Sequence, residues 1–166
     1  IETADTITAF YNASDESSRL KKNRHSQIEF LISMRYLQEV IPENSRILDC
    51  CAGTGIYAFA LAKQHRVVAG DLSEKHIAQM KELQKDAPQL EEIHMDIFED
   101  ESFDVVLCMG ALYHLFSYED RMNAIRECVR LCKKGGILVF AYLNKWGNFY
   151  NGMINNLKPM DLLYRE

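Results

Sequence analysis

The fold of this chain is decided by one stretch in its first third, Ile47-Leu48-Asp49-Cys50-Cys51-Ala52-Gly53-Thr54-Gly55. An apolar run leads into an acidic residue, and a glycine turn then opens a helix expected over 56–64. Glycine is needed where the backbone approaches a ligand closely or takes a positive φ, and Gly53 and Gly55 flank such a turn. The stretch therefore predicts a buried strand, then a ligand-binding turn at the start of a helix.

A second acidic residue, Asp71, follows the next apolar run, 67–70. It comes about 20 residues after the turn begins, which is the offset of the acid that holds a ribose in nucleotide-binding α/β folds. The carboxylate at the end of this strand suits hydrogen bonding to ribose hydroxyls. We infer a cofactor that contains a nucleoside.

The residues around the turn favour one kind of cofactor over another. A dinucleotide site requires G-x-G-x-x-G. Here Gly53 and Gly55 are followed by Ala58 in the third position, where a small residue is permitted, but the position two before Gly53 is Cys51 and not glycine. Asp49 would repel a pyrophosphate, whereas it would attract the ammonium group of an amino acid. S-adenosylmethionine carries such an ammonium and has no phosphate, so the pattern favours it over a nicotinamide dinucleotide.

Residues 46–142 resemble a class I S-adenosylmethionine-dependent methyltransferase of the small-molecule type. The resemblance rests on six pieces in this order: Ile47-Leu48-Asp49 with Ala52-Gly53-Thr54-Gly55, Asp71-Leu72-Ser73, Asp96-Ile97, Ser102-Phe103-Asp104-Val105-Val106, Gly110-Ala111-Leu112-Tyr113-His114-Leu115 and Lys134-Gly135-Gly136-Ile137-Leu138. The chain departs from the family at Cys51, where glycine is usual. The resemblance implies an α/β fold of the Rossmann-like, doubly wound type.

The order of apolar segments supports the same architecture. Strands are expected at 46–50, 66–70, 91–95, 103–109 and 136–142, and helices at 27–41, 56–64, 74–85 and 118–133. Alternating strands and helices predict a mostly parallel sheet with helices on both faces.

Three parts are expected along the chain. These are an N-terminal helical cap over 1–45, an S-adenosylmethionine-binding core over 46–142 and an irregular segment over 143–166, the possible start of a substrate-cap insertion. Members of the family usually end with a further helix and an antiparallel strand pair. We therefore expect the C-terminal strands to be incomplete, with residues missing near 97–102 and after 143.

The amino-acid composition narrows the class of protein further. The chain has 166 residues, 48% of them apolar, and a net charge of −5, which describes one globular domain and disfavours binding to nucleic acid. No apolar run approaches the roughly 20 residues that span a bilayer, and no signal peptide is visible, so we expect a cytoplasmic protein without membrane contact.

Five cysteines, an odd number, favour reduced thiols. Cys128 and Cys132 are spaced i, i+4 on an expected helix, which suggests a metal. No histidine or acid at ligand spacing completes a set, so no metal is expected and the thiols are interpreted as buried apolar groups.

The resemblance implies roles for individual residues. Asp49 and the turn would hold the methionine moiety, Asp71 the ribose and Asp96 the adenine amino group, with Leu72 and Ile97 against the ring. The expected cofactor-binding residues are Asp49, Cys51, Ala52, Gly53, Gly55, Asp71, Leu72, Asp96, Ile97, Met109 and, from the N-terminal segment, Tyr11.

The segment after the fourth strand carries the candidate catalytic residue, His114. Its ordinary pKa suits a general base near neutral pH, although a histidine that only bonds the loop is an equal alternative. Tyr113 is expected to shape the pocket of the acceptor.

The sequence thus predicts an enzyme that transfers a methyl group from S-adenosylmethionine to a small molecule. Two alternatives stay open. One is a non-catalytic module that only binds S-adenosylmethionine, and the other, less favoured, is an NAD-dependent oxidoreductase.

Overall fold

The computed structural model describes residues 24–86, 90–93, 98–144 and 146. Its strands are β1 (Arg46–Asp49), β2 (Arg66–Ala69), β3 (Leu90–Ile93), β4 (Phe103–Cys108) and β5 (Cys132–Phe140), and its helices are α3 (Arg24–Val40), α4 (Ile56–Leu61), α5 (Glu74–Leu83) and α6 (Tyr118–Leu131). Every predicted strand and helix is present, most within two residues of the expected bounds. Helix α4 is shorter than expected because it ends at Leu61, and β5 begins four residues early.

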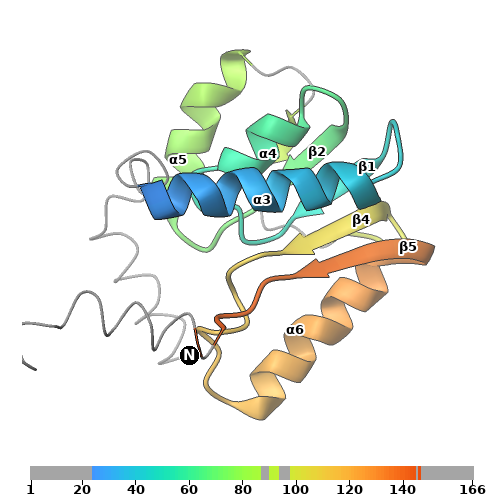
Figure 1. Cartoon of the computed structure of the whole chain (residues 1–166). Helices are drawn as coiled ribbons and strands as arrows, with labels where there is room; N and C mark the ends of the chain where they lie inside the picture. Colours follow the sequence, from blue (N-terminus) through green and yellow to red (C-terminus); the bar gives the residue numbers. More distant parts are fainter. Residues whose placement is uncertain (1–23, 87–89, 94–97, 145, 147–166) are drawn as a thin grey trace, which may run out of the picture.

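The five strands form one sheet in the order β3-β2-β1-β4-β5, and every neighbouring pair is parallel (Figure 1). Successive strands therefore need crossover connections, and helices supply most of them. This arrangement confirms the predicted doubly wound α/β fold. In the described residues β5 is an edge strand, and the prediction about strands after 143 concerns residues that mostly lie outside this part of the chain.

Alternate residues of the central strands enter two separate cores. Ile47, Val67 and Val105 lie side by side in register and are fully buried in one cluster. Their neighbours Leu48 and Val68, together with Val106, fill a second cluster on the opposite face. Both faces are apolar because both are covered, which explains why these strands have continuous apolar sequences.

The helices divide between these two cores. Apolar side chains of α3, α4 and α5 pack in the first cluster, whereas α6 packs in the second (Figure 1). Ser73 and Ser117 precede α5 and α6, and each side chain accepts a hydrogen bond from a backbone N–H in the first turn. Ser73 is therefore the N-cap of α5.

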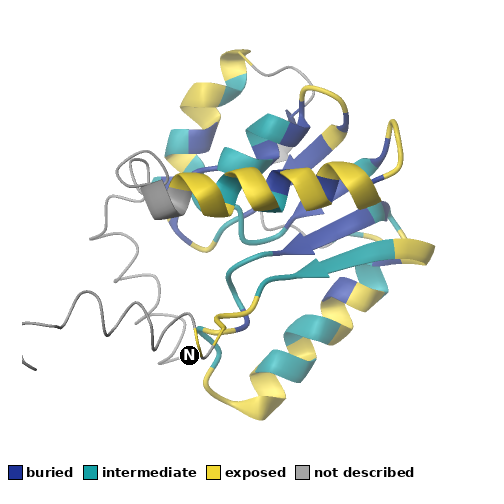
Figure 2. Cartoon of the chain, viewed as in Figure 1, coloured by how far each residue is buried: buried dark blue, intermediate teal, exposed yellow. Residues whose placement is uncertain are grey.

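The apolar residues of α3 suggest one buried face made of Ile28, Leu31, Ile32, Leu37, Val40 and Ile41, but the structure buries only part of it. Met34, Leu37 and Ile41 are its buried residues, while Ile28, Leu31, Ile32 and Val40 are about half exposed or more. Figure 2 shows this outer side of α3 in yellow, above the dark blue of β4. The expectation was wrong for those four because their side chains spread over more of the helix than one strip of sheet can cover.

The sequence Lys133-Lys134-Gly135-Gly136 suggests a tight turn before the fifth strand, but these residues are part of β5. Cys132 pairs with Phe103 and Ile137 pairs with Val105, so β5 carries extra residues in an irregularity opposite Asp104. A Cβ at Gly136 would come within 2.7 Å of the Asp104 carbonyl oxygen, which explains the glycine there. The Lys133 ammonium contacts the Asp104 carboxylate at 2.6 Å and secures the irregular segment.

Among the described residues, no helix is both long enough and apolar enough to cross a membrane.

Candidate cofactor site

The site lies where the strand order changes direction. β1 leads to β2 on one side, and the chain returns to place β4 on the other side of β1. In open α/β sheets, ligands bind at the carboxyl ends of the strands at this switch point. The loops after β1, β2 and β4 meet there, and they carry most of the predicted site residues.

The glycine turn after β1 has the backbone conformation that the sequence suggested. Gly53 has φ 57° and Gly55 has φ 82°, both in the left-handed region. The Ala52 N–H donates to the Gly70 carbonyl oxygen at 2.9 Å, which ties the turn to the end of β2. The turn is therefore a fixed feature of the sheet edge.

The two glycines serve different purposes. No atom lies within 4 Å of the position that a Cβ would take at Gly53, so this residue faces open space. A Cβ at Gly55 would lie 2.8 Å from the Phe59 ring and 3.0 Å from Met80. Gly55 is thus required by packing between α4 and α5, whereas Gly53 is free to approach a ligand.

Asp71 lies directly against the turn. Its Oδ2 accepts a hydrogen bond from the Gly53 N–H at 2.8 Å, and its Oδ1 accepts one from the Ser73 N–H at 2.8 Å. The His76 Nδ1 lies 3.1 Å from the same Oδ1. A carboxylate offers about four acceptor positions, so Asp71 keeps capacity for one further donor, on Oδ2.

Asp49 is the most unusual polar group of the site. It is 2% exposed, and its Oδ2 has no hydrogen-bond partner among the described residues. Burial, followed by the charge of nearby Asp71, raises the pKa of the Asp49 carboxyl to about 7, although a backbone hydrogen bond from Cys51 opposes the shift. A buried carboxylate is costly unless a cation or donor meets it.

These features fit the ligand that the sequence suggested. The free oxygen of Asp49 suits an ammonium group, and the remaining acceptor position of Asp71 suits a hydroxyl. Gly53, in the loop that follows Asp49, has open space at its Cβ position. The residues at this sheet edge are therefore suited to an amino acid joined to a nucleoside.

Strand β4 leads to the residues expected to line the site of the methyl acceptor, at the same edge of the sheet. Met109 follows β4 and packs against the first core, and the Tyr113 hydroxyl approaches Gly110, 3.5 Å from the position of a Cβ there. The rings of Tyr113 and His114 are 4.6 Å apart, and the His114 N–H donates to the Ala111 carbonyl oxygen. Both side chains are therefore placed after β4, as predicted, and the general-base role of His114 stays a prediction.

Of the other predicted site residues, the structure describes only some. Leu72 is 53% exposed beside Asp71, as suits a residue that would lie against a ligand. Tyr11, Asp96 and Ile97 lie outside the described residues, and their roles stay predictions.

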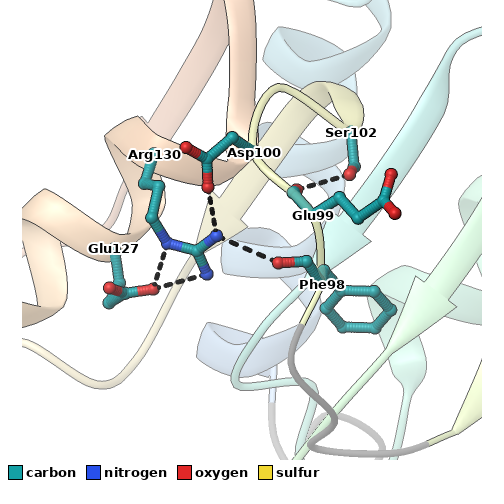
Figure 3. Close-up of polar contacts among 6 residues, drawn as sticks. All are labelled: Phe98, Glu99, Asp100, Ser102, Glu127 and Arg130. Atoms are coloured by element: carbon teal, nitrogen blue, oxygen red, sulfur yellow. Dashed lines mark hydrogen bonds and ion pairs between the residues drawn. The ribbon is translucent and has the colours of Figure 1, made fainter.

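The described residues after the Asp96 position are firmly held. Figure 3 shows Arg130 of α6 reaching the connection between β3 and β4, where it donates to the Phe98 carbonyl oxygen at 2.9 Å and to Asp100 at 2.6 Å. Glu127, one turn earlier on α6, holds the other side of the guanidinium. This contact fixes the short connection to the helix that covers the second core.

A cluster of thiols was missed by the sequence reasoning, which considered only Cys128 with Cys132. The sulfurs of Cys50, Cys108 and Cys128 all lie within 4.8 Å of one another. They come from the loop after β1, the end of β4 and the last turn of α6, and all five cysteines of the chain are free thiols. Only the neighbouring positions of β1 and β4 in the sheet reveal that the three belong together.

The fold and the site define the class of protein, an α/β domain that binds a nucleoside-containing cofactor. Residues 48–140, more than half of the chain, match the family model described as a methyltransferase domain. The chain belongs to this methyltransferase family.

Individual relatives agree with this assignment. The chain is 33% identical over 111 residues to the ubiquinone biosynthesis O-methyltransferase of Paracidovorax citrulli, covering 62% of this chain and 45% of the relative. It is 30% identical over 122 residues to the protein of the same name from Coxiella burnetii, covering 69% of this chain and 50% of the relative. The chain thus spans about half the length of these curated relatives.

The solved structures agree on the fold. The N-methyltransferase NodS of Bradyrhizobium japonicum, solved with S-adenosyl-L-homocysteine, superposes with a TM-score of 0.70 at 22% identity, covering 83% of this chain and 72% of that one. At this identity the likeness establishes the architecture alone.

Proposed function

We propose that this chain carries the cofactor-binding core of an S-adenosylmethionine-dependent methyltransferase that acts on a small molecule. The observation that carries the proposal is the buried Asp49 carboxylate, whose Oδ2 lacks a partner among the described residues. It stands beside a glycine turn and a second carboxylate, Asp71, and family membership supplies the chemistry that joins them.

In this proposal each residue has a separate task. Asp49 receives the ammonium of the methionine moiety, and the Gly53 backbone leaves room for it. Asp71 accepts a ribose hydroxyl, while Leu72, with Asp96 and Ile97, surrounds the adenine. Cys51 and Ala52 complete the turn, and Met109 and Tyr11 are assigned as further cofactor contacts.

The cofactor supplies an electrophilic sulfonium methyl group, so the protein mainly needs to align an acceptor and exclude water. We assign this task to Tyr113 and His114, which follow β4 at the same sheet edge. A base is required only where the acceptor arrives protonated, which makes His114 dispensable for some acceptors. The acceptor is a small molecule; two relatives are named as O-methyltransferases and one solved neighbour as an N-methyltransferase.

The proposal also covers the cellular compartment of the protein and the kind of partner it binds. Five free thiols fit the reducing cytoplasm, and the net charge of −5 fits a partner other than nucleic acid.

Ligand binding separates this function from its alternatives. The chain should be stabilised against heat by S-adenosylmethionine and S-adenosylhomocysteine but not by NAD, and a ligand at 100 times its Kd adds about 2.7 kcal/mol. Stabilisation by NAD alone would contradict the proposal. Formation of S-adenosylhomocysteine across a panel of phenols, amines, thiols and carboxylates then distinguishes an enzyme from a module that only binds.

A further inference from the structure

Three thiols converge on the far side of the sheet from α3. Cys108 ends β4 and Cys128 lies in the last turn of α6, and they are 1% and 5% exposed. Cys50, which follows β1, is half-buried above them. The cofactor role proposed above uses none of these three side chains.

We propose that Cys50, Cys108 and Cys128 form a binding site for a thiophilic divalent metal ion of the Zn²⁺ type. The three sulfurs already lie within 4.8 Å of one another. Zn–S bonds are about 2.3 Å long, so ligand sulfurs in a tetrahedral site lie about 3.8 Å apart. Closing the remaining gap takes at most about 1 Å, which side-chain rotation can supply.

A fourth sulfur stands next to this trio. Cys51 Sγ lies 3.9 Å from Cys50 Sγ, close to the separation that tetrahedral zinc requires. Cys51 is half-buried, so it is the nearest candidate for the fourth position. Four-coordinate sulfur sites are characteristic of zinc and of iron–sulfur clusters.

The elements that supply the ligands are themselves well fixed. β1 and β4 are hydrogen-bonded neighbours, and the Cys50 N–H continues their ladder by donating to the Leu107 carbonyl oxygen at 3.0 Å. Cys128 packs in the same core cluster as Cys108. The thiols are therefore held close before any metal arrives, which reduces the entropic cost of binding.

Charge favours a divalent ion over a monovalent one. Three thiolates around Zn²⁺ leave one net negative charge, whereas around Cu⁺ they leave two. Asp49 precedes Cys50, and its charge is felt at Cys51. Each excess negative charge in this buried region is costly, and for the same set of thiolates the divalent ion leaves one fewer than the monovalent ion.

The ion can reach the cluster from one side. Cys108 and Cys128 are enclosed by the core, but Cys50 and Cys51 are both half-buried in the loop at the sheet edge. The Cys50 thiol donates to the Leu107 carbonyl oxygen at 3.1 Å, and this hydrogen bond would be exchanged for the bond to the metal.

The test uses Co²⁺ as a spectroscopic substitute for Zn²⁺. The full chain, reduced and kept free of oxygen, should develop sulfur-to-cobalt charge-transfer absorption that saturates at one equivalent. Zn²⁺ should then displace the cobalt and abolish the absorption. Absence of this absorption with the folded wild-type chain would overturn the proposal, without need of any variant.

Two matched variants locate the ion. Cys128→Ser removes a proposed ligand, and Cys132→Ser removes another buried cysteine four residues later that lies outside the trio. Loss of an outer partner of a metal ligand costs 10–100-fold in affinity, so loss of a ligand should cost at least about 100-fold. Cys132→Ser should bind Zn²⁺ within about threefold of wild type.

Equal affinity of the two variants would also overturn the proposal. Circular dichroism establishes that each variant is folded. If Cys128→Ser is not, Cys50→Ser at the half-buried position replaces it, and wild-type affinity there would count equally against the site.

Discussion

The backbone N–H of Gly53 donates a 2.8 Å hydrogen bond to the Asp71 carboxylate, and this contact joins the loops after β1 and β2. The acid that would hold a ribose therefore also fixes the turn that would hold the methionine moiety. Three donors already approach Asp71, and about one acceptor position remains. We therefore expect Asp71 to accept one ribose hydroxyl directly, a narrower role than the shared acceptor that the sequence suggested.

Replacing Asp71 with alanine should weaken S-adenosylmethionine binding by about 1.5–3 kcal/mol, the range for a hydrogen bond to a charged group. Titration calorimetry measures this as an increase in Kd of roughly 10-fold to 150-fold. Asp86→Ala is the control, because Asp86 is an exposed acid beyond α5. Unchanged affinity in folded Asp71→Ala would remove this residue from the site.

Replacing Gly53 should abolish cofactor binding while leaving much of the fold in place. Gly53→Val introduces a β-branched side chain into the open space beside the turn and resists the positive φ. Circular dichroism and calorimetry together measure the two effects.

The chain offers a closely matched control for this variant. Gly135 also has a positive φ, of 78°, and open space at its Cβ position, but it lies in β5. Gly135→Val should therefore carry similar backbone strain and still bind S-adenosylmethionine. If the two variants bind equally well, Gly53 does not face the cofactor.

Asp49 makes the stability of the ligand-free chain depend on pH. The unfolded carboxyl ionises near pH 3.9 and the folded one near 7, so the folded chain holds an extra proton between these values. Stability should therefore fall as pH rises from about 4 to 7 and then level off. Asp49→Asn cannot ionise at this position, so its stability should not show this fall with rising pH. Thermal unfolding of both proteins between pH 4.5 and 7.5 measures the difference.

The same titration should govern cofactor binding. An ammonium group binds the ionised carboxylate, so affinity for S-adenosylmethionine should rise by up to about tenfold per unit between pH 5.5 and 7. Asp49→Asn should bind weakly and without this slope. A wild-type affinity that is flat over this interval would show that Asp49 does not meet the ammonium.

The role of His114 can be decided by a pH profile. A general base would make the rate rise with pH through its pKa, and His114→Gln should flatten this rise and lower the rate about a hundredfold or more. S-adenosylmethionine affinity should change little. Methyl transfer from pH 6 to 9 is the measurement.

A structural histidine would behave differently. His114→Gln would then lower the unfolding midpoint and leave the shape of the pH profile intact. His65→Gln is the comparison, since His65 is a buried histidine just before β2, at the other end of the strand from the site. Full activity of His114→Gln at every pH would leave positioning as the source of the rate.

The sequence was most informative where structure is local. Apolar runs such as 105–108 predicted central strands because residues on both faces are buried, and the Asp49 turn predicted its own conformation through its glycines. The bounds of β5 were harder to predict, since Lys133 and Gly136 resemble a turn until Asp104 is seen opposite them.

Features that depend on the sheet order could not be predicted in the same way. Cys50 and Cys108 meet because β1 and β4 are neighbours, and Cys128 joins them because α6 covers that face. The burial of Asp49, with no partner for its Oδ2 in the part of the chain that the structure describes, is likewise a property of the packed site. Neither the meeting of the three cysteines nor the burial of Asp49 can be predicted from a pattern along the sequence.

The pairing of β1 with β4 also bears on how the chain folds. The Arg46 N–H donates to the Asp104 carboxylate across 58 residues, whereas β1 with β2 and β4 with β5 each form a shorter unit around one helix. Closing the long loop is entropically costly, so the two units are expected to form first and to dock along β1 and β4 afterwards. Substitutions along the β1–β4 pairing should slow refolding more than equally destabilising ones within either unit. The rate of folding is then governed by the same junction that brings together the loops of the candidate cofactor site.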